Sequence, residues 1–414
     1  MQRFAAACDA VAGTTKKLQK IAIVADYLAA RSVPEAALSA LFLSGRPFAA
    51  YEERTLQVGG AILWRAVGEI SGASEALMTA AYKKHGDLGD ATFEVLRNSA
   101  PKHSTLTLKE VDYMFQHIAA ASGAAAKSRL VVTLLARATA VEAKYLVKII
   151  SSELRIGLKE SQVEEAIAKA FGRELSKVRR ANMLVGDIGE TVVMAANDRL
   201  DEARMRLFHP IGFMLATPAE NAEEAFEEFE HAIVEDKYDG IRAQAHVSRE
   251  RVRLFSRTLD DITESFPELV PALKAIEREV ILDGEILAWR GGQALAFSEL
   301  QKRLGRKKVS AAMQRDIPVS YVAFDVLYAN NELVIDQPLA QRAGLLDEIF
   351  VEAGPRLASV GPLGQTSLSF AEAADEQRVL RAPQARANSP AELDRLFEAA
   401  QERGNEGLMI KDVN

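Results

Sequence analysis

The sequence predicts a multi-domain protein in which an all-α N-terminal domain, residues 1–210, precedes an α+β domain built on antiparallel sheets, residues 211–414. In the first part, apolar residues recur at three- and four-residue spacing, which is typical of amphipathic helices. From Val234 onward, short apolar runs separated by turns indicate strands instead. The chain has 414 residues, 48% of them hydrophobic, and is long enough for two or three cores.

Helices account for most of the first domain. The helical spacing is clearest in five segments: residues 38–43, 106–118, 130–135, 143–150 and 163–171. Ser104 or Thr107 before Glu110, and Ser161 before Glu164, are expected to cap helix starts, because their hydroxyl oxygens can accept bonds from backbone N–H groups. Helix ends are expected at four glycines: Gly157, Gly172, Gly186 and Gly189. A repeat of fixed period is absent from the sequence, which argues against a solenoid.

Short strands and a few helices are expected in the second domain. The strands are expected over residues 233–237, 241–247, 252–256, 280–288, 319–327 and 407–411. The helices are expected over residues 263–277, 340–351 and 391–403. The join at residues 209–212 is short and stiffened by Pro210, so the two domains are expected to be hinged but not far apart. Residues 354–388 show no clear period.

Composition and charge favour an intracellular protein that meets nucleic acid. Cys8 is the single cysteine, which excludes an internal disulfide and fits a reducing compartment such as the cytoplasm. The six histidines are scattered, so no zinc site is expected, and no apolar run has the length of a membrane span. The net charge of -7 divides into +5 for residues 1–210 (28 basic, 23 acidic) and -12 for residues 211–414 (23 basic, 35 acidic). The first part is therefore expected to meet a phosphate backbone.

One short segment combines an amine, a tight turn and an arginine: Lys237-Tyr238-Asp239-Gly240-Ile241-Arg242. A lysine amine is a nucleophile in its neutral form, which desolvation or neighbouring cations favour. Asp239-Gly240 is a strong hairpin signal, so Lys237 is expected at the end of one strand and Arg242 at the start of the next. Taken alone, the segment is more typical of an ordinary hairpin with solvated charges.

The next segment downstream adds two acids on one strand. Asp283 and Glu285 follow an apolar run and share one face of the expected strand, while Gly284 between them allows another group to approach the backbone. Two carboxylates on one face suit a ribose hydroxyl or a magnesium ion. A turn or an edge strand with solvated acids is the alternative.

Two more segments supply an aromatic ring and a second lysine. Asp325 interrupts an apolar run, where a carboxylate must be paired or ligated, and Phe324 beside it can stack on a base. Glu406 and Lys411 flank a short apolar strand, so that a carboxylate suited to a metal lies at one end and an amine suited to a phosphate at the other. The alternative for Phe324 is plain core packing, and the alternative for the segment from Glu406 to Lys411 is a surface strand with charged ends.

In this order, the four segments resemble the nucleotidyltransferase motifs of ATP-dependent DNA ligases. The resemblance implies that Lys237 becomes covalently adenylylated and that Glu235 lies near the adenine amino group. Arg242 corresponds to the arginine that closes the lysine motif and contacts the nucleotide or the nick. Residues 254–257 look like the next family motif, whose arginine, Arg257, lies near the ribose and the DNA phosphate.

The remaining site residues follow from the same resemblance. Glu285 matches the acid that binds the ribose, and we also expect it to bind the metal, while Phe324 matches the aromatic residue that stacks on adenine. Glu406 matches an acid associated with the metal, and Lys411 matches the lysine near the α-phosphate. ATP as the AMP donor and Mg²⁺ are therefore the implied cofactors.

The first domain resembles the helical DNA-binding domain that precedes the catalytic core in larger ligases. Residues 42–46, 153–157 and 163–171 carry this second resemblance. In the family, the domain holds duplex DNA by its backbone and minor groove, largely without regard to sequence. Four basic residues are expected to contact phosphates, with solvated helix faces as the alternative: Arg155, Lys159, Arg179 and Arg180.

The resemblance predicts a DNA ligase that seals nicks in double-stranded DNA, acts as a monomer, has no membrane partner and lies in the cytoplasm or on a bacterial nucleoid. Complete ligases continue with a strand of paired lysines and an oligonucleotide-binding-fold domain, whereas this sequence ends at Asn414, so impaired sealing is expected. A non-catalytic DNA-binding remnant of a ligase is the alternative. An RNA ligase or capping-type guanylyltransferase fits the helical first domain less well.

Overall fold

The computed structural model describes residues 1–49, 51–52, 54–227, 229, 232–291, 293–303, 309–354 and 378–414. It divides into two compact units, Met1–Arg204 and Met205–Asn414, each of which is described by itself. The sequence placed the join after residue 210, a few residues beyond the division between the units. Most of the region of unclear period, residues 354–388, lies outside the described residues.

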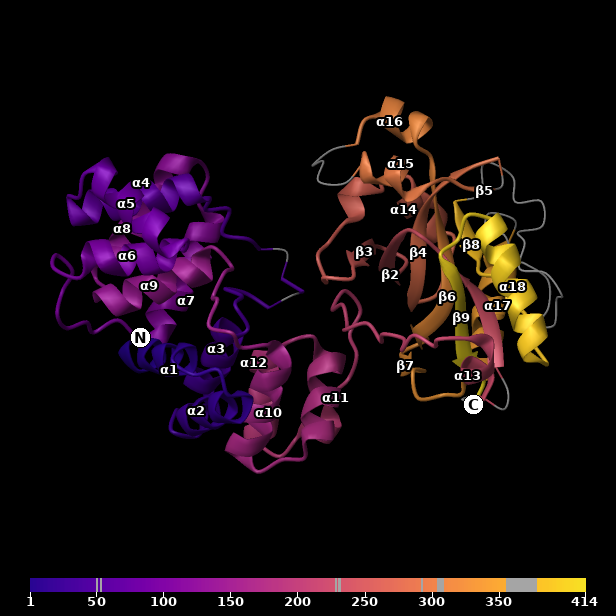
Figure 1. Cartoon of the computed structure of the whole chain (residues 1–414), viewed down its shortest axis with the longest axis horizontal. Helices are drawn as coiled ribbons and strands as arrows, with labels where there is room; N and C mark the ends of the chain where they lie inside the picture. The colour runs from indigo at the N-terminus through magenta and orange to yellow at the C-terminus, as the bar shows by residue number, and fades with distance from the viewer. Residues whose placement is uncertain are drawn as a thin grey trace. The chain divides into compact units, whose positions relative to one another are not determined.

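The first unit is all helical (Figure 1). Its α-helices are α1 Gln2–Ala12, α2 Lys17–Ala29, α3 Val33–Leu43, α4 Gly60–Ser71, α5 Glu75–His85, α6 Leu88–Leu96, α7 Leu108–Ala120, α8 Ala124–Ala136, α9 Ala140–Ile150, α10 Glu160–Phe171, α11 Leu175–Val185 and α12 Ile188–Ala196, and a 3-10 turn, η1, follows at Leu200–Glu202. The five segments predicted to be helical fall in α3, α7, α8, α9 and α10, with ends that differ by a few residues. The all-α prediction is therefore confirmed.

Helix caps in this unit partly follow the prediction. Thr107 caps α7, because its hydroxyl accepts from the backbone N of Glu110 at 3.1 Å and the Glu110 carboxylate accepts from the backbone N of Thr107 at 2.9 Å. Gly172 and Gly186 end α10 and α11 in the left-handed conformation, as expected. Ser161 is not a cap, because α10 already begins at Glu160.

Two of the predicted glycine stops are wrong. Gly189 lies inside α12, whose start is capped by Asp187, and a side chain on Gly189 would approach the carbonyl oxygen of Ala37 in α3 to 3.2 Å. Gly157 lies in the loop between α9 and α10 at φ +64°, with the ammonium of Lys20 beside it. These glycines permit close approaches rather than helix ends.

The second unit combines a mixed but mainly antiparallel sheet with a separate strand pair (Figure 1). The strands are β1 Ala232–Lys237, β2 Ile241–Val247, β3 Val252–Ser256, β4 Val280–Arg290, β5 Gln293–Ala294, β6 Val319–Ala329, β7 Glu332–Leu333, β8 Val379–Arg381 and β9 Gly407–Asp412. The order in the larger sheet is β3-β2-β4-β6-β7; β5 pairs with β4, and β8 runs parallel to β6. The antiparallel α+β prediction is confirmed.

The helices of the second unit are short except for two. They are α13 Ala222–Glu227, α14 Leu269–Leu273, α15 Phe297–Gln301, α16 Ala311–Asp316, α17 Leu339–Glu352 and α18 Pro390–Glu402, with a 3-10 turn, η2, at Thr263–Ser265. The helix predicted over residues 263–277 is wrong: it is divided into η2 and α14, because Pro267 disfavours helical backbone at Phe266. The helices predicted at residues 340–351 and 391–403 are confirmed as α17 and α18.

The predicted hairpin at Asp239-Gly240 is also wrong. The backbone turns there, but β1 pairs with β9, and β2 pairs with β3 and β4. The two strands that flank the turn therefore belong to different sheets. Gly240 is required by a close approach to β4, because a side chain at this position would lie 2.5 Å from the carbonyl oxygen of Ile286.

Candidate active site

Lys237 ends β1 and faces the start of β9. Its ammonium forms an ion pair with Glu406, and its carbonyl oxygen accepts from the backbone N of Glu406 at 2.9 Å. The side chains of Lys237 and Glu406 are 49% and 43% exposed, so a ligand from solvent can reach both. The strand pair therefore presents an accessible amine beside an accessible carboxylate.

A buried carboxylate immediately precedes this lysine. Asp236, whose side chain is 1% exposed, accepts two bonds from the Arg403 guanidinium, at 3.0 and 2.8 Å, and a third from the amide of Asn405 at 2.8 Å. Burial raises the pKa of Asp236, while the bonds from Arg403 act in the opposite direction. Because Arg403 and Asn405 lie just before Glu406, Asp236 fixes the turn that carries Glu406. No motif in the sequence had identified Asp236.

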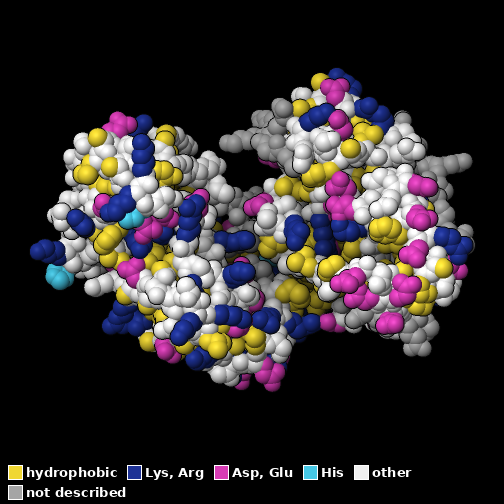
Figure 2. Space-filling view, viewed as in Figure 1, with side chains coloured by type: hydrophobic (Ala, Val, Ile, Leu, Met, Phe, Trp, Pro, Cys, Tyr) yellow, Lys and Arg dark blue, Asp and Glu magenta, His cyan; other side chains and the backbone are white. Residues whose placement is uncertain are grey.

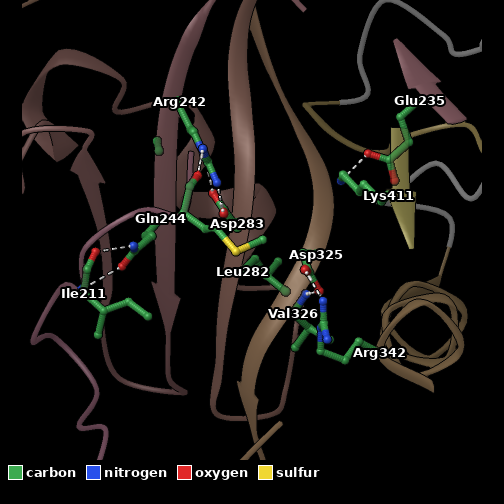
Figure 3. Close-up of polar contacts among 12 residues, drawn as sticks. Ile211, Glu235, Arg242, Gln244, Leu282, Asp283, Asp325, Val326, Arg342 and Lys411 are labelled. Carbon is green, nitrogen blue, oxygen red and sulfur yellow. Dashed lines mark hydrogen bonds and ion pairs between the residues drawn. The ribbon is translucent and has the colours of Figure 1, made fainter. Parts of the chain in front are cut away.

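Glu235 lies on the same strand, and it faces Lys411. The Lys411 ammonium donates to Glu235 at 2.5 Å (Figure 3). The amide of Gln384 donates to the other carboxylate oxygen at 2.6 Å. Backbone hydrogen bonds between Val234 and Ala385 hold Gln384 in place. Gln384 falls in the region of unclear period, and no motif in the sequence had identified it either.

Phe324 connects this group of residues with those on the larger sheet. The Lys411 nitrogen lies 4.7 Å from the Phe324 ring centroid, and the Arg242 guanidinium carbon lies 5.6 Å from it. Both separations allow cation–π attraction. Pairing of β4 with β6 steps from Asp283↔Asp325 to Gly284↔Ala323, so Phe324 is the extra residue of a β-bulge. A bulge redirects side chains relative to regular alternation.

Arg242 and Asp283 form an ion pair on neighbouring strands. The Arg242 guanidinium donates to the two Asp283 oxygens at 3.3 and 2.8 Å and to the carbonyl oxygen of Met214 at 2.8 Å (Figure 3). Asp283 is buried, so its carboxylate serves as a partner for Arg242 rather than as a ligand open to solvent. The guanidinium also lies 4.8 Å from the ring centroid of Phe213.

Glu285 is directly opposite Arg242 in the β2–β4 register. Burial raises its pKa to about 8, with the Arg242 charge opposing that shift. Gly284, the preceding residue, lets the Tyr321 ring pack closely against the backbone of β4, because a Cβ at this position would lie 2.5 Å from that ring. The Tyr321 hydroxyl is directed to the carbonyl oxygens of Ala243 and Leu282, at 3.0 and 3.1 Å.

Asp325 is paired, as the sequence analysis required. It accepts two bonds of 2.9 Å from the guanidinium of Arg342 on α17 (Figure 3). The pair attaches α17 to β6 beside the Phe324 bulge. Asp325 is therefore a structural anchor for that helix, and nothing in the sequence pattern identified Arg342 as its partner.

The structure brings together most of the predicted site residues but leaves some apart. The β1–β9 pair carries Glu235, Lys237 and Lys411, and Glu406 immediately precedes β9. Phe324 links Lys411 to Arg242, which lies opposite Glu285. Arg257 is exposed in the turn after β3, and within the described residues it forms no hydrogen bond or ion pair with this group.

The carboxylates offer a limited site for a metal. Among the described residues, no three His, Cys, Asp or Glu side chains are gathered as a ready-made metal site. Glu406 is accessible, however, and Mg²⁺ is commonly held by one or two carboxylates together with substrate phosphates and water. The chemistry of this donor set therefore fits a magnesium ion that arrives with a nucleotide.

The four predicted DNA contacts lie on exposed parts of the helical unit. Arg155 pairs with Glu153 at 2.5 Å and lines a cavity of about 890 Å³ whose walls belong to the helical unit alone. Arg179 lies 3.5 Å from Glu165, and Lys159 precedes α10. Basic side chains are frequent on the face of this unit drawn in Figure 2, interspersed with acidic and apolar ones.

Comparisons with known proteins agree with this architecture. The family model for the ATP dependent DNA ligase domain matches residues 213–414, and the model for the DNA ligase N terminus matches residues 1–168. A probable DNA ligase of Koribacter versatilis is 79% identical over this whole chain, which spans 72% of that protein. A probable DNA ligase of Opitutus terrae is 38% identical over 99% of this chain, which spans 48% of that protein. The chain belongs to the ATP-dependent DNA ligase family.

A solved structure titled Pmar-Lig_PreS3 has the same fold over nearly the whole chain. It matches with a TM-score of 0.54 at 12% identity, covering 99% of this chain and 74% of that one. The family models and the curated relatives confirm the predicted family, with ATP as its nucleotide and DNA as its substrate class. Within the described residues, each helix is too short or too polar to cross a membrane.

Proposed function

We propose that this chain seals nicks in double-stranded DNA through a covalent AMP on Lys237. The accessible Lys237 amine, on the strand pair that also carries Glu235 and Lys411, is the observation that carries the proposal. Its neutral amine attacks the α-phosphate of ATP, a phosphorus–nitrogen bond forms, and pyrophosphate leaves. AMP then passes to the 5′-phosphate at the nick, and the 3′-hydroxyl displaces it.

The surrounding side chains bind the nucleotide. Phe324 stacks on the base and Glu235 accepts from its amino group, while Glu285 accepts from the ribose. Lys411 and Arg242 stabilise the charge that develops on the phosphates. Arg257, on its exposed turn, reaches the DNA phosphate.

A magnesium ion would be held by Glu406, and by Glu285 once that carboxylate is ionised. When bound, the ion supplies positive charge to the phosphate oxygens. Glu406 also changes partner in this scheme, because its carboxylate must leave the Lys237 ammonium before that amine can react. The accessible position of both side chains permits this exchange.

The helical unit is proposed to hold the DNA duplex, and the protein is proposed to act as a monomer. Phosphate contacts from the exposed residues Arg155, Lys159, Arg179 and Arg180 would be independent of sequence. A fragment of residues 1–210 should bind duplex DNA and lose affinity steeply as salt rises, because bound phosphates release counterions. We expect the protein to act in the cytoplasm, on the nucleoid if the cell is bacterial.

Peptide mapping after incubation with labelled ATP and magnesium tests the catalytic assignment. Label is expected on Lys237 alone; it should vanish in Lys237→Ala and persist in Lys274→Ala, a control at an exposed lysine that ends α14. Label that survives Lys237→Ala would refute the assignment. A chain that binds nicked DNA without labelling Lys237 would favour the DNA-binding remnant.

A further inference from the structure

Lys411 already makes both contacts that the proposed function assigns to the base. Its ammonium donates to Glu235 at 2.5 Å (Figure 3). The same nitrogen lies 4.7 Å from the centre of the Phe324 ring. An ammonium and an adenine are chemically alike in these two respects, since each donates N–H bonds and each is attracted to an aromatic face. The lysine therefore occupies the place of the base.

The two occupants exclude one another. A base stacked on Phe324 requires atoms at about 3.5 Å from the ring, in the space between Phe324 and Glu235 where the ammonium now lies. The side chain of Glu235 is only 2% exposed, so its free surface is too small for a second donor of that size. Base binding thus requires Lys411 to leave.

Glu235 itself is held in place during such an exchange. Gln384 donates to its other oxygen at 2.6 Å, and the Val234–Ala385 backbone bonds fix Gln384 beside it. Lys411, by contrast, has a long side chain that is 22% exposed, on a strand whose backbone is fixed by pairing with β1. The lysine side chain can therefore move while the carboxylate remains ready to accept from the base.

We propose that Lys411 makes the site selective for phosphorylated nucleotides over free nucleosides. This inference rests on the proposed function of Glu235 and Phe324. When the base displaces it, the ammonium loses a charge-assisted hydrogen bond and needs another anion. A nucleotide supplies that anion in its α-phosphate, and a nucleoside does not. Binding of the base and binding of the phosphate are thereby coupled through one side chain.

Calorimetric titration with adenosine and with AMP separates this role from a simple phosphate contact. Lys411→Met removes the competitor for the base, so adenosine should bind about tenfold more tightly than to the wild type, an effect of one charge-assisted hydrogen bond. AMP should bind no more tightly than to the wild type. The preference for AMP over adenosine therefore falls in Lys411→Met.

Two further variants complete the test. Lys411→Arg keeps a cation on Glu235 and should retain the wild-type preference, whereas Lys274→Met, at an exposed lysine, should change neither affinity. Unchanged or weaker adenosine binding by a folded Lys411→Met overturns the inference, and if ATP still labels Lys237 in the wild type, the proposed function survives. A wild type that neither binds AMP nor labels Lys237 overturns both.

Discussion

Replacing Arg403 by methionine tests how far the buried carboxylate beside the nucleophile depends on its partner. Asp236 is 1% exposed and would keep a single donor, the Asn405 amide at 2.8 Å, in place of three. Removing one partner of a buried ion pair costs about 3–5 kcal/mol, because an uncompensated charge remains. For a unit of this size, that corresponds to a lowering of Tm by roughly 6–20 °C.

Urea unfolding followed by tryptophan fluorescence measures this loss of stability in the second structural unit, which contains Asp236 and Arg403. The chain has two tryptophans, and Trp289 is buried in the second unit, so a Trp64→Phe background lets Trp289 report on that unit alone. In this background, Arg403→Met should lower the free energy of unfolding by about 3–5 kcal/mol. Asp236→Asn combined with Arg403→Met should recover part of the loss, because a neutral amide replaces the buried charge.

The pH dependence of Arg403→Met gives an independent check. Burial raises the pKa of Asp236, and removal of the opposing guanidinium raises it further. The native state then binds a proton at a higher pH than the unfolded state, so stability falls as pH rises through this interval. The destabilisation should be smaller at acidic pH than at neutral pH. A loss below about 1 kcal/mol, or a double variant no more stable than Arg403→Met, would contradict the reasoning.

Three further predictions concern buried groups of the second unit. Burial lowers the pKa of His246 to about 3, so as pH falls from 6.5 the unfolded state binds a proton before the native state does, and the free energy of unfolding should decline by up to about 1.4 kcal/mol per pH unit. His246→Asn should flatten this decline in urea titrations, and an unchanged slope would contradict the reasoning. Because the pKa of Glu285 is about 8, ATP should bind more tightly as pH rises from 7 to 9, a dependence that calorimetry should find absent in Glu285→Gln. Tyr321→Phe removes the hydroxyl that donates to two carbonyl oxygens and should lower the free energy of unfolding by about 1–3 kcal/mol. A loss within error would show that the backbone hydrogen bonds between the strands satisfy these oxygens without the hydroxyl.

Much of the secondary structure was predictable because its causes are local. The strands predicted at residues 241–247 and 252–256 have the same limits in the structure, since the alternation of apolar residues and the turns that bound it lie within a few residues. Where a local signal competed with a tertiary contact, the prediction was wrong: Gly189 serves close packing against α3 instead of a helix end.

The candidate site was predictable in its residue types but not in its partners. The motifs drew attention to Lys237, Glu235 and Lys411, yet the sequence contained no sign that Glu235 and Lys411 pair with each other. Gln384 was missed because it lies in a segment without a period, and Arg403 because its position before the last strand is also typical of a surface helix end.

The sequence by itself determined the two-part fold, many of its helices and strands, the family and the set of chemical groups at the site. Tertiary structure alone decided that β1 pairs with β9 instead of β2, that Phe324 forms a bulge, and that Asp236 holds the turn before Glu406. The difference has a physical cause. Backbone preference depends on neighbours along the chain, whereas the partner of a strand or of a buried charge depends on which distant surfaces must be removed from water together.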